Sequence, residues 1–178
     1  MNFYIVYILS LVLILSMIED LRAQKIPNAL TYPAMLLAIA YHLYIGGTIG
    51  LIFSLKGLGL GMGIYFVLYL MGWMGAGDAK LMGIIGATLG ANGAIIVILY
   101  TSVVGGVYAL VLMVSRHNQF NGFFRQQFEC LKSIFLTHSF LPTYVQEKHP
   151  KLCYGVAIAL GTFIYMGLEI SQFGQIIN

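Results

Sequence analysis

Long apolar runs divide this sequence, and the segments between them hold 12 of its 15 charged residues. A helix needs about 20 mainly apolar residues, and at least about 17, to cross the hydrocarbon layer of a bilayer. Six runs reach or approach this length: residues 2–18, 30–45, 49–73, 79–89, 94–115 and 152–170. They predict an all-α polytopic membrane protein with about six transmembrane helices, which forms one domain over residues 1–178 and has the lipid bilayer as a partner. The run 79–89 is short, which leaves open a broken or re-entrant start.

The composition excludes several other classes of protein. Sixty per cent of the 178 residues are hydrophobic and 8% are charged, which is too apolar for a soluble domain of this length. Nine Lys and Arg residues form no basic stripe, so we expect no nucleic-acid partner. Two isolated cysteines and four scattered histidines have no metal-ligand spacing, so we expect no metal and no cofactor.

The basic residues predict the topology. Eight of the nine lie on one side of the predicted membrane, in alternate connections or, for Lys80, at the start of the fourth run: Arg22, Lys25, Lys80, Arg116, Arg125, Lys132, Lys148 and Lys151. By the positive-inside rule, these connections are cytoplasmic and both termini lie outside the cell membrane. The segment 119–137 has aromatic residues at three- and four-residue steps, which predicts an amphipathic helix on the cytoplasmic leaflet.

Glycines with a spacing of four residues predict close contacts between helices. The pairs are Gly57 with Gly61, Gly59 with Gly63, and Gly86 with Gly90. Small residues at this spacing allow the backbones of two membrane helices to approach each other.

Two aspartates are candidates for chemistry. Asp20 follows the first apolar run and Asp78 precedes the fourth, so both are expected at the inner end of the membrane on the same side. An ionisable group at membrane depth is costly unless it is paired or hydrated, which makes it a functional candidate. Two nearby aspartates share a proton, so that one can act as general base on water and the other as general acid. Glu19 lies at the same depth but points about 100° away from Asp20 around a helix.

The residues beside these acids favour bent and closely packed backbone. Gly75 and Gly77 allow the backbone before Asp78 to approach another helix. Pro27 ends a helix after Asp20, and Asn28 is placed to cap the next one. Other catalytic sets are missing, since the sequence contains neither the H-E-x-x-H pattern of zinc peptidases nor the G-x-S-x-G pattern of serine hydrolases.

The stretches "DLRAQKIPNALT" and "GAGDAKLMG" resemble the type IV prepilin peptidases, which are membrane aspartic peptidases of the GxGD kind. The run "YGVAIALG" resembles the final helix of that family. By matching position, the resemblance implies that Asp20 and Asp78 are the catalytic pair. Supporting positions then fall on Gly75, Gly77, Lys80, Arg22, Pro27 and Asn28.

The resemblance implies an endopeptidase that removes the short basic leader of pilin-like precursors at the cytoplasmic face of the membrane, just before the precursor's hydrophobic helix. Larger members carry a four-cysteine zinc domain and also N-methylate the new terminus. Here only about ten residues separate the first two runs, so we expect proteolysis without methylation, as in the compact peptidases of Flp/Tad-type pili or of archaeal flagellin-like systems.

Two other functions remain open on the sequence. Small ion- or proton-coupled transporters also contain acidic residues within the membrane. In such proteins the acids are expected near the middle of the bilayer, and the two halves of the sequence are expected to be similar repeats. A catalytically silent scaffold for pilus assembly would present the aromatic segment 119–137 to partners. The oligomeric state is unknown from the sequence.

Overall fold

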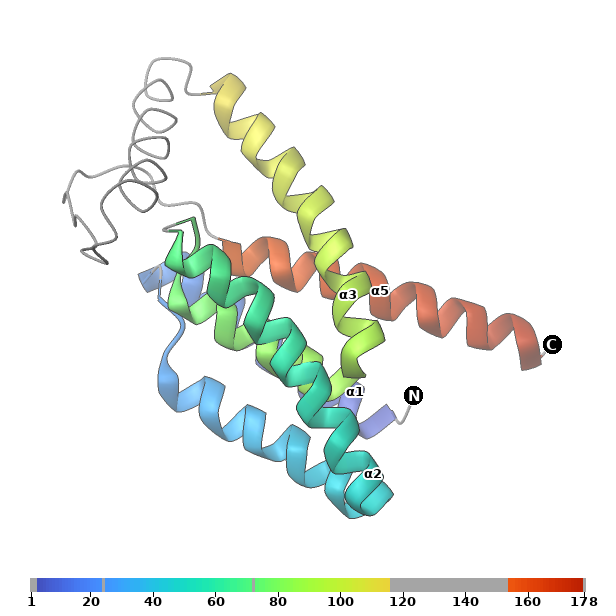
Figure 1. Ribbon diagram of the computed structural model, residues 1–178. Helices are drawn as coiled ribbons and strands as arrows, with labels where there is room; N and C mark the ends of the chain where they lie inside the picture. Colours follow the sequence, from blue (N-terminus) through green and yellow to red (C-terminus); the bar gives the residue numbers. More distant parts are fainter. Residues whose placement is uncertain (1–2, 24, 72, 116–153, 178) are drawn as a thin grey trace.

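A computed structural model of the chain describes residues 3–23, 25–71, 73–115 and 154–177. The elements in this part are α1 (Phe3–Ala23), α2 (Asn28–Leu70), α3 (Ala76–Ser115) and α5 (Tyr154–Ile177) (Figure 1). Of these, α2, α3 and α5 are long and apolar enough to cross a membrane. The chain is therefore an all-α polytopic membrane protein, as predicted. The predicted amphipathic helix 119–137 lies outside the described residues.

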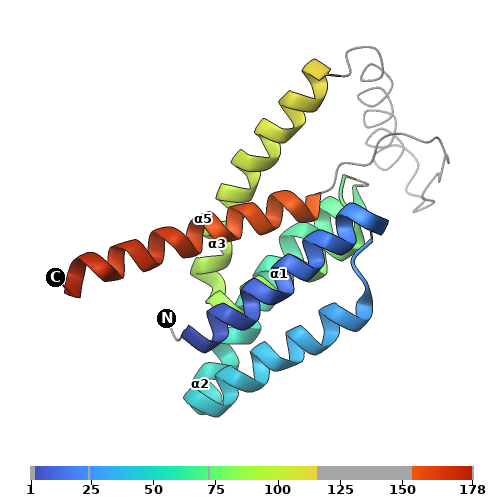
Figure 2. The same cartoon turned by 180° about the vertical axis from the view of Figure 1, so that it is seen from behind.

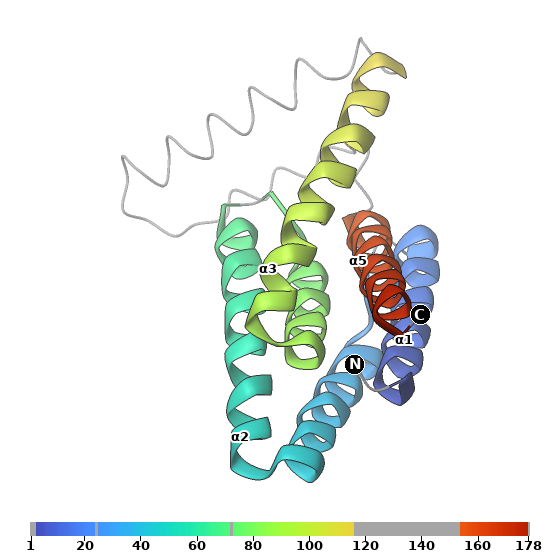
Figure 3. The ribbon, with the colours of Figure 1, turned by 90° about the vertical axis from the view of Figure 1, so that its right-hand side faces the viewer.

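Two elements contain an interior break at a glycine. Gly47 divides α2 and Gly90 divides α3, and both have a positive φ, of 55° and 76°. A residue with a Cβ atom is strained at positive φ, so glycine is the residue that permits each break. The two arms of α2 fold back on each other as a hairpin, and the arm of α3 after Gly90 changes direction and crosses α5 (Figures 1 and 3). The breaks fall within the turns predicted between the second and third and between the fourth and fifth apolar runs.

Two helices extend beyond the apolar runs that predicted them. α1 continues to Ala23, five residues past the run 2–18, so Asp20 lies inside its last turn. α3 begins at Ala76, three residues before the predicted start of the fourth run, and Asp78 is helical in place of being in a loop. The helices are longer than the runs because hydropathy marks only the apolar part of a helix. The charged residues at the end of α1 and at the start of α3 are helical as well.

The second arm of α2 packs most closely against the first arm of α3. A Cβ atom on Gly57 would overlap the carbonyl of Gly86, and a Cβ on Gly86 would overlap the carbonyl of Gly57. Gly61 lies in the same way against the carbonyl of Met82. The predicted close packing is therefore confirmed for the first and third glycine pairs. It is wrong for Gly59 and Gly63, because these residues are exposed and no atom of the described residues would lie within 4 Å of an added Cβ.

Polar side chains satisfy the carbonyls that the break at Gly90 leaves without helical partners. Ser54 Oγ donates to the Ala87 carbonyl at 2.9 Å, and His42 Nε2 donates to the Thr88 carbonyl at 2.9 Å. The last four carbonyls of a helix have no amide partner within it, and in an apolar setting each needs another donor. These two residues of α2 thus stabilise the broken helix α3.

Removing the Ser54 hydroxyl is expected to lower the stability of the protein. Ser54→Ala leaves the Ala87 carbonyl without this buried donor, at a cost of about 0.6–2 kcal/mol. Thermal unfolding in detergent measures the change. The matched control is Ser102→Ala, because the Ser102 hydroxyl is exposed and donates to the Ile98 carbonyl of its own helix. Equal melting temperatures for the two variants would contradict the role of Ser54.

Candidate active site

Asp78 is buried in the first turn of α3, where its side chain caps its own helix. Its Oδ2 accepts a hydrogen bond from the backbone N–H of Gly75 at 3.1 Å, and its own N–H donates to the Gly75 carbonyl at 3.1 Å. This reciprocal arrangement resembles a capping box, in which the third helical residue reaches back to the residue before the helix. The carboxylate therefore lies at the positive end of the α3 dipole.

The two glycines before Asp78 provide space. A Cβ on Gly75 would lie 3.3 Å from Asp78 Oδ2, and a Cβ on Gly77 would lie 3.1 Å from the Cβ of Ile26. Ile26 is buried and belongs to the turn between α1 and α2. Gly75 thus leaves room for the carboxylate, and Gly77 allows the α1–α2 turn to pack against the start of α3.

Asp20 is buried in the last turn of α1, and its partner comes from α5. Its Oδ2 accepts a hydrogen bond from the backbone N–H of Gly155 at 2.9 Å, and Val156 contributes a further backbone hydrogen bond. Burial raises the pKa of Asp20 above its ordinary value, and the two backbone donors partly offset that rise. Asp20 therefore lies at the start of α5, just as Asp78 lies at the start of α3.

The two aspartates lie at one end of the bundle. The end of α1 and the starts of α3 and α5 lie together in opposite views (Figures 1 and 2). Asp20 is 6% exposed and Asp78 is 8% exposed. The two carboxyl groups are close enough to interact electrostatically. This pair of buried acids is the candidate active site.

Two tyrosines near this pair were not predicted from the sequence. Tyr65 of α2 and Tyr154 of α5 both interact electrostatically with Asp78. Tyr65 is only 2% exposed, which is unusual for a phenol in an apolar helix. Twelve tyrosines are spread over the chain, and no local pattern distinguishes these two.

Lys80 and Asn28 contact each other across the helices. Lys80 Nζ donates to Asn28 Oδ1 at 2.6 Å and lies 4.9 Å from the centre of the Tyr32 ring. The predicted capping role of Asn28 was wrong. Pro27 occupies the N-cap position of α2, without a side-chain cap, and Asn28 is the first helical residue.

The other two predicted supporting residues have different surroundings. The Pro27 carbonyl accepts backbone hydrogen bonds from Leu30 at 3.1 Å and Thr31 at 3.3 Å, which begins α2. The Arg22 side chain is exposed at the end of α1.

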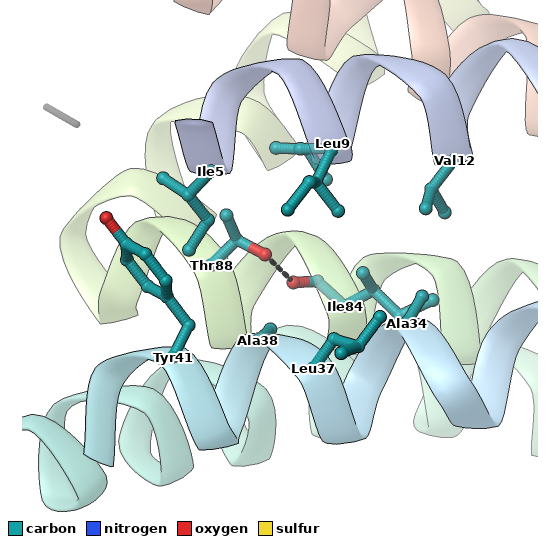
Figure 4. Close-up of a pocket in the computed structure, with 10 residues that line it drawn as sticks. Ile5, Leu9, Val12, Ala34, Leu37, Ala38, Tyr41, Ile84 and Thr88 are labelled. Carbon is teal, nitrogen blue, oxygen red and sulfur yellow. Dashed lines mark hydrogen bonds between the residues drawn. The ribbon is translucent and has the colours of Figure 1, made fainter. Parts of the chain in front are cut away.

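A small apolar pocket lies among α1, α2 and α3 (Figure 4). Of the residues that line it, Val12 of α1 and Ile84 of α3 come nearest in sequence to the two acids, and at 1.5 Å per residue they lie about 12 Å and about 9 Å along their helices from Asp20 and Asp78. Thr88 Oγ1 donates to the Ile84 carbonyl at 2.8 Å and is not free for chemistry. We assign this pocket no catalytic role.

Comparison with known proteins agrees with the resemblance seen in the sequence. No curated protein and no solved structure gave a significant match. The type IV leader peptidase family matches residues 7–110, which is more than half of the 178 residues and includes both aspartates. The chain belongs to the type IV leader peptidase family.

Proposed function

We propose that this protein is a membrane-embedded aspartic endopeptidase that removes the N-terminal leader from type IV pilin-like precursors. Membership of the leader peptidase family supports a peptidase. The observation that carries the aspartic mechanism is the pair of buried, interacting carboxyl groups of Asp20 and Asp78, which come from different helices and share one end of the bundle. The proposal places this end at the cytoplasmic face of the cell membrane, with six crossings and both termini outside.

The mechanism follows from one proton shared by two carboxyl groups. The ionised carboxylate takes a proton from water, and the oxygen of that water attacks the carbonyl carbon of the scissile peptide. The protonated carboxyl group gives its proton to the leaving nitrogen as the C–N bond breaks. The products are a carboxylic acid at the end of the leader and a new amine on the mature pilin-like protein.

A cleavage assay tests the proposal. The purified protein in liposomes is incubated with a precursor that has a basic leader before a hydrophobic helix. Mass spectrometry of the product should show loss of the leader and an unmethylated new N-terminus, even when a methyl donor is added. Methylation is not expected, because the chain has only two cysteines and about ten residues between its first two apolar runs. An uncut precursor would overturn the proposed function, and a methylated product would overturn its restriction to proteolysis.

The rate of cleavage should have a bell-shaped dependence on pH. At low pH both carboxyl groups are protonated and no base remains, whereas at high pH the shared proton is lost and no acid remains. The second ionisation places two negative charges together, which moves it to higher pH. Burial acts in the same direction, because it raises the pKa of Asp20.

Activity should therefore persist to a pH well above the ordinary range of aspartate before it falls. The measurement is kcat/KM over the pH range in which the protein remains folded. A profile with a single limb would contradict a shared proton.

A further inference from the structure

The start of α5 holds a candidate catalytic group by its backbone. Gly155 N–H donates to Asp20 Oδ2 at 2.9 Å, and this buried bond joins residues 135 positions apart in the chain. α5 begins at Tyr154 and lies outside residues 7–110, the part of the chain that the peptidase family matches. A segment outside the matched region therefore contacts the candidate active site directly.

Position 155 has no space for a side chain. A Cβ there would lie 2.7 Å from Asp20 Oδ2, 3.0 Å from its Cγ and 3.1 Å from its Cβ. Gly155 is helical, so the backbone conformation itself would accept alanine, which is a better helix former than glycine. The constraint at this position is the Asp20 carboxyl group and not the local backbone.

We propose that Gly155 is a positioning residue, which lets the N-terminus of α5 fix the Asp20 carboxylate in the orientation needed for peptide cleavage. The inference rests on the proposed function. Backbone N–H groups at a helix start favour a negative charge, both through hydrogen bonds and through the helix dipole. The contact therefore also stabilises the charged form of Asp20.

The test uses the full chain in liposomes, with the same synthetic precursor. Gly155→Ala pushes on the carboxyl group, and a displacement of about 1 Å at a catalytic group can cost about 100-fold in rate. We expect kcat to fall by about 10- to 100-fold. The matched control is Gly167→Ala on the same helix, where an added Cβ would have no atom of the described part of the chain within 4 Å. That variant should cleave at the wild-type rate.

The pH profile separates positioning from a merely structural effect. A weaker contact with α5 makes Asp20 harder to ionise, so the residual activity of Gly155→Ala should be displaced to higher pH by about one unit. Gly155→Ala leaves the other titratable groups of these helices unchanged: Asp78 of α3, Tyr65 of α2 and Tyr154 of α5, which interact electrostatically at the site, and Glu19 and Arg22 elsewhere on α1. Wild-type activity and an unshifted profile for Gly155→Ala would overturn the inference.

A stability measurement keeps the test valid even if Gly155→Ala folds poorly. Asp20→Ala removes the Oδ2 and Cγ atoms that the new methyl group would meet. The melting temperature lost through Gly155→Ala should therefore be largely recovered in the double variant with Asp20→Ala. Additive losses would overturn the inference. Failure of the wild-type chain to cut any precursor would instead count against the proposed function, since this coupling does not depend on activity.

Discussion

Asp78→Asn and Asp20→Asn should each abolish leader removal while the protein still inserts and folds. Asparagine keeps the shape of the side chain and can still accept the backbone hydrogen bond from Gly75 or Gly155. It cannot hold or exchange the shared proton. General acid–base catalysis is typically worth about 100- to 10,000-fold, so loss of either carboxyl group should reduce kcat at least this much.

The measurement is single-turnover cleavage of the synthetic precursor by each variant. Glu19→Gln is the control, because it changes a carboxyl group next to Asp20 that points elsewhere on α1 and has no place in the proposed mechanism. It should retain activity close to wild type. Normal processing by Asp78→Asn would rule out the aspartic mechanism, and loss of activity in Glu19→Gln would show that the wrong acid of α1 has been assigned.

Gly57→Ala should strongly destabilise the helix bundle. The new Cβ would overlap the carbonyl of Gly86, which is backbone and cannot rotate away. Relief requires α2 and α3 to move apart, and inserting a methyl group into a packed interface typically costs about 1–3 kcal/mol. The same movement would shift Asp78, which lies in the first turn of the arm of α3 that carries Gly86.

Thermal unfolding in detergent and the yield of folded protein measure this effect. Gly59→Ala is a close control, because Gly59 lies two residues away on the same helix and an added Cβ there would have no atom within 4 Å. That variant should match or slightly exceed the wild type, since alanine is the better helix former. If Gly57→Ala is as stable as Gly59→Ala, then α2 and α3 do not pack as described.

The sequence contains enough information to predict the helices but not how they pack. The apolar runs mark the helical arms, and the gaps between them at 46–48 and 90–93 contain Gly47 and Gly90, where the helices break. Local sequence does not determine that Gly57, and not Gly59, makes the close contact. The two pairs have the same spacing, and only the rotation of α2 against α3 decides which one is buried.

The candidate site divides in the same way. Asp20 and Asp78 could be identified because charged groups are rare in these runs, and the glycines before Asp78 suggested a close approach of backbone. The bond from Gly155 to Asp20 crosses 135 residues and arises only when α5 packs against α1. Asn28 looked like a helix cap because capping preferences are local, but Lys80 from α3 occupies its side chain.

A short thiol crosslink between positions 20 and 78 tests the central claim most directly, namely that these two side chains face each other in the membrane. In a chain whose native Cys130 and Cys153 are replaced by serine, Asp20→Cys with Asp78→Cys should be joined rapidly by a short bifunctional thiol reagent. The control pair, Glu19→Cys with Asp78→Cys, should react far more slowly because residue 19 points about 100° away. Equal or slower crosslinking of the pair at 20 and 78 would contradict the account.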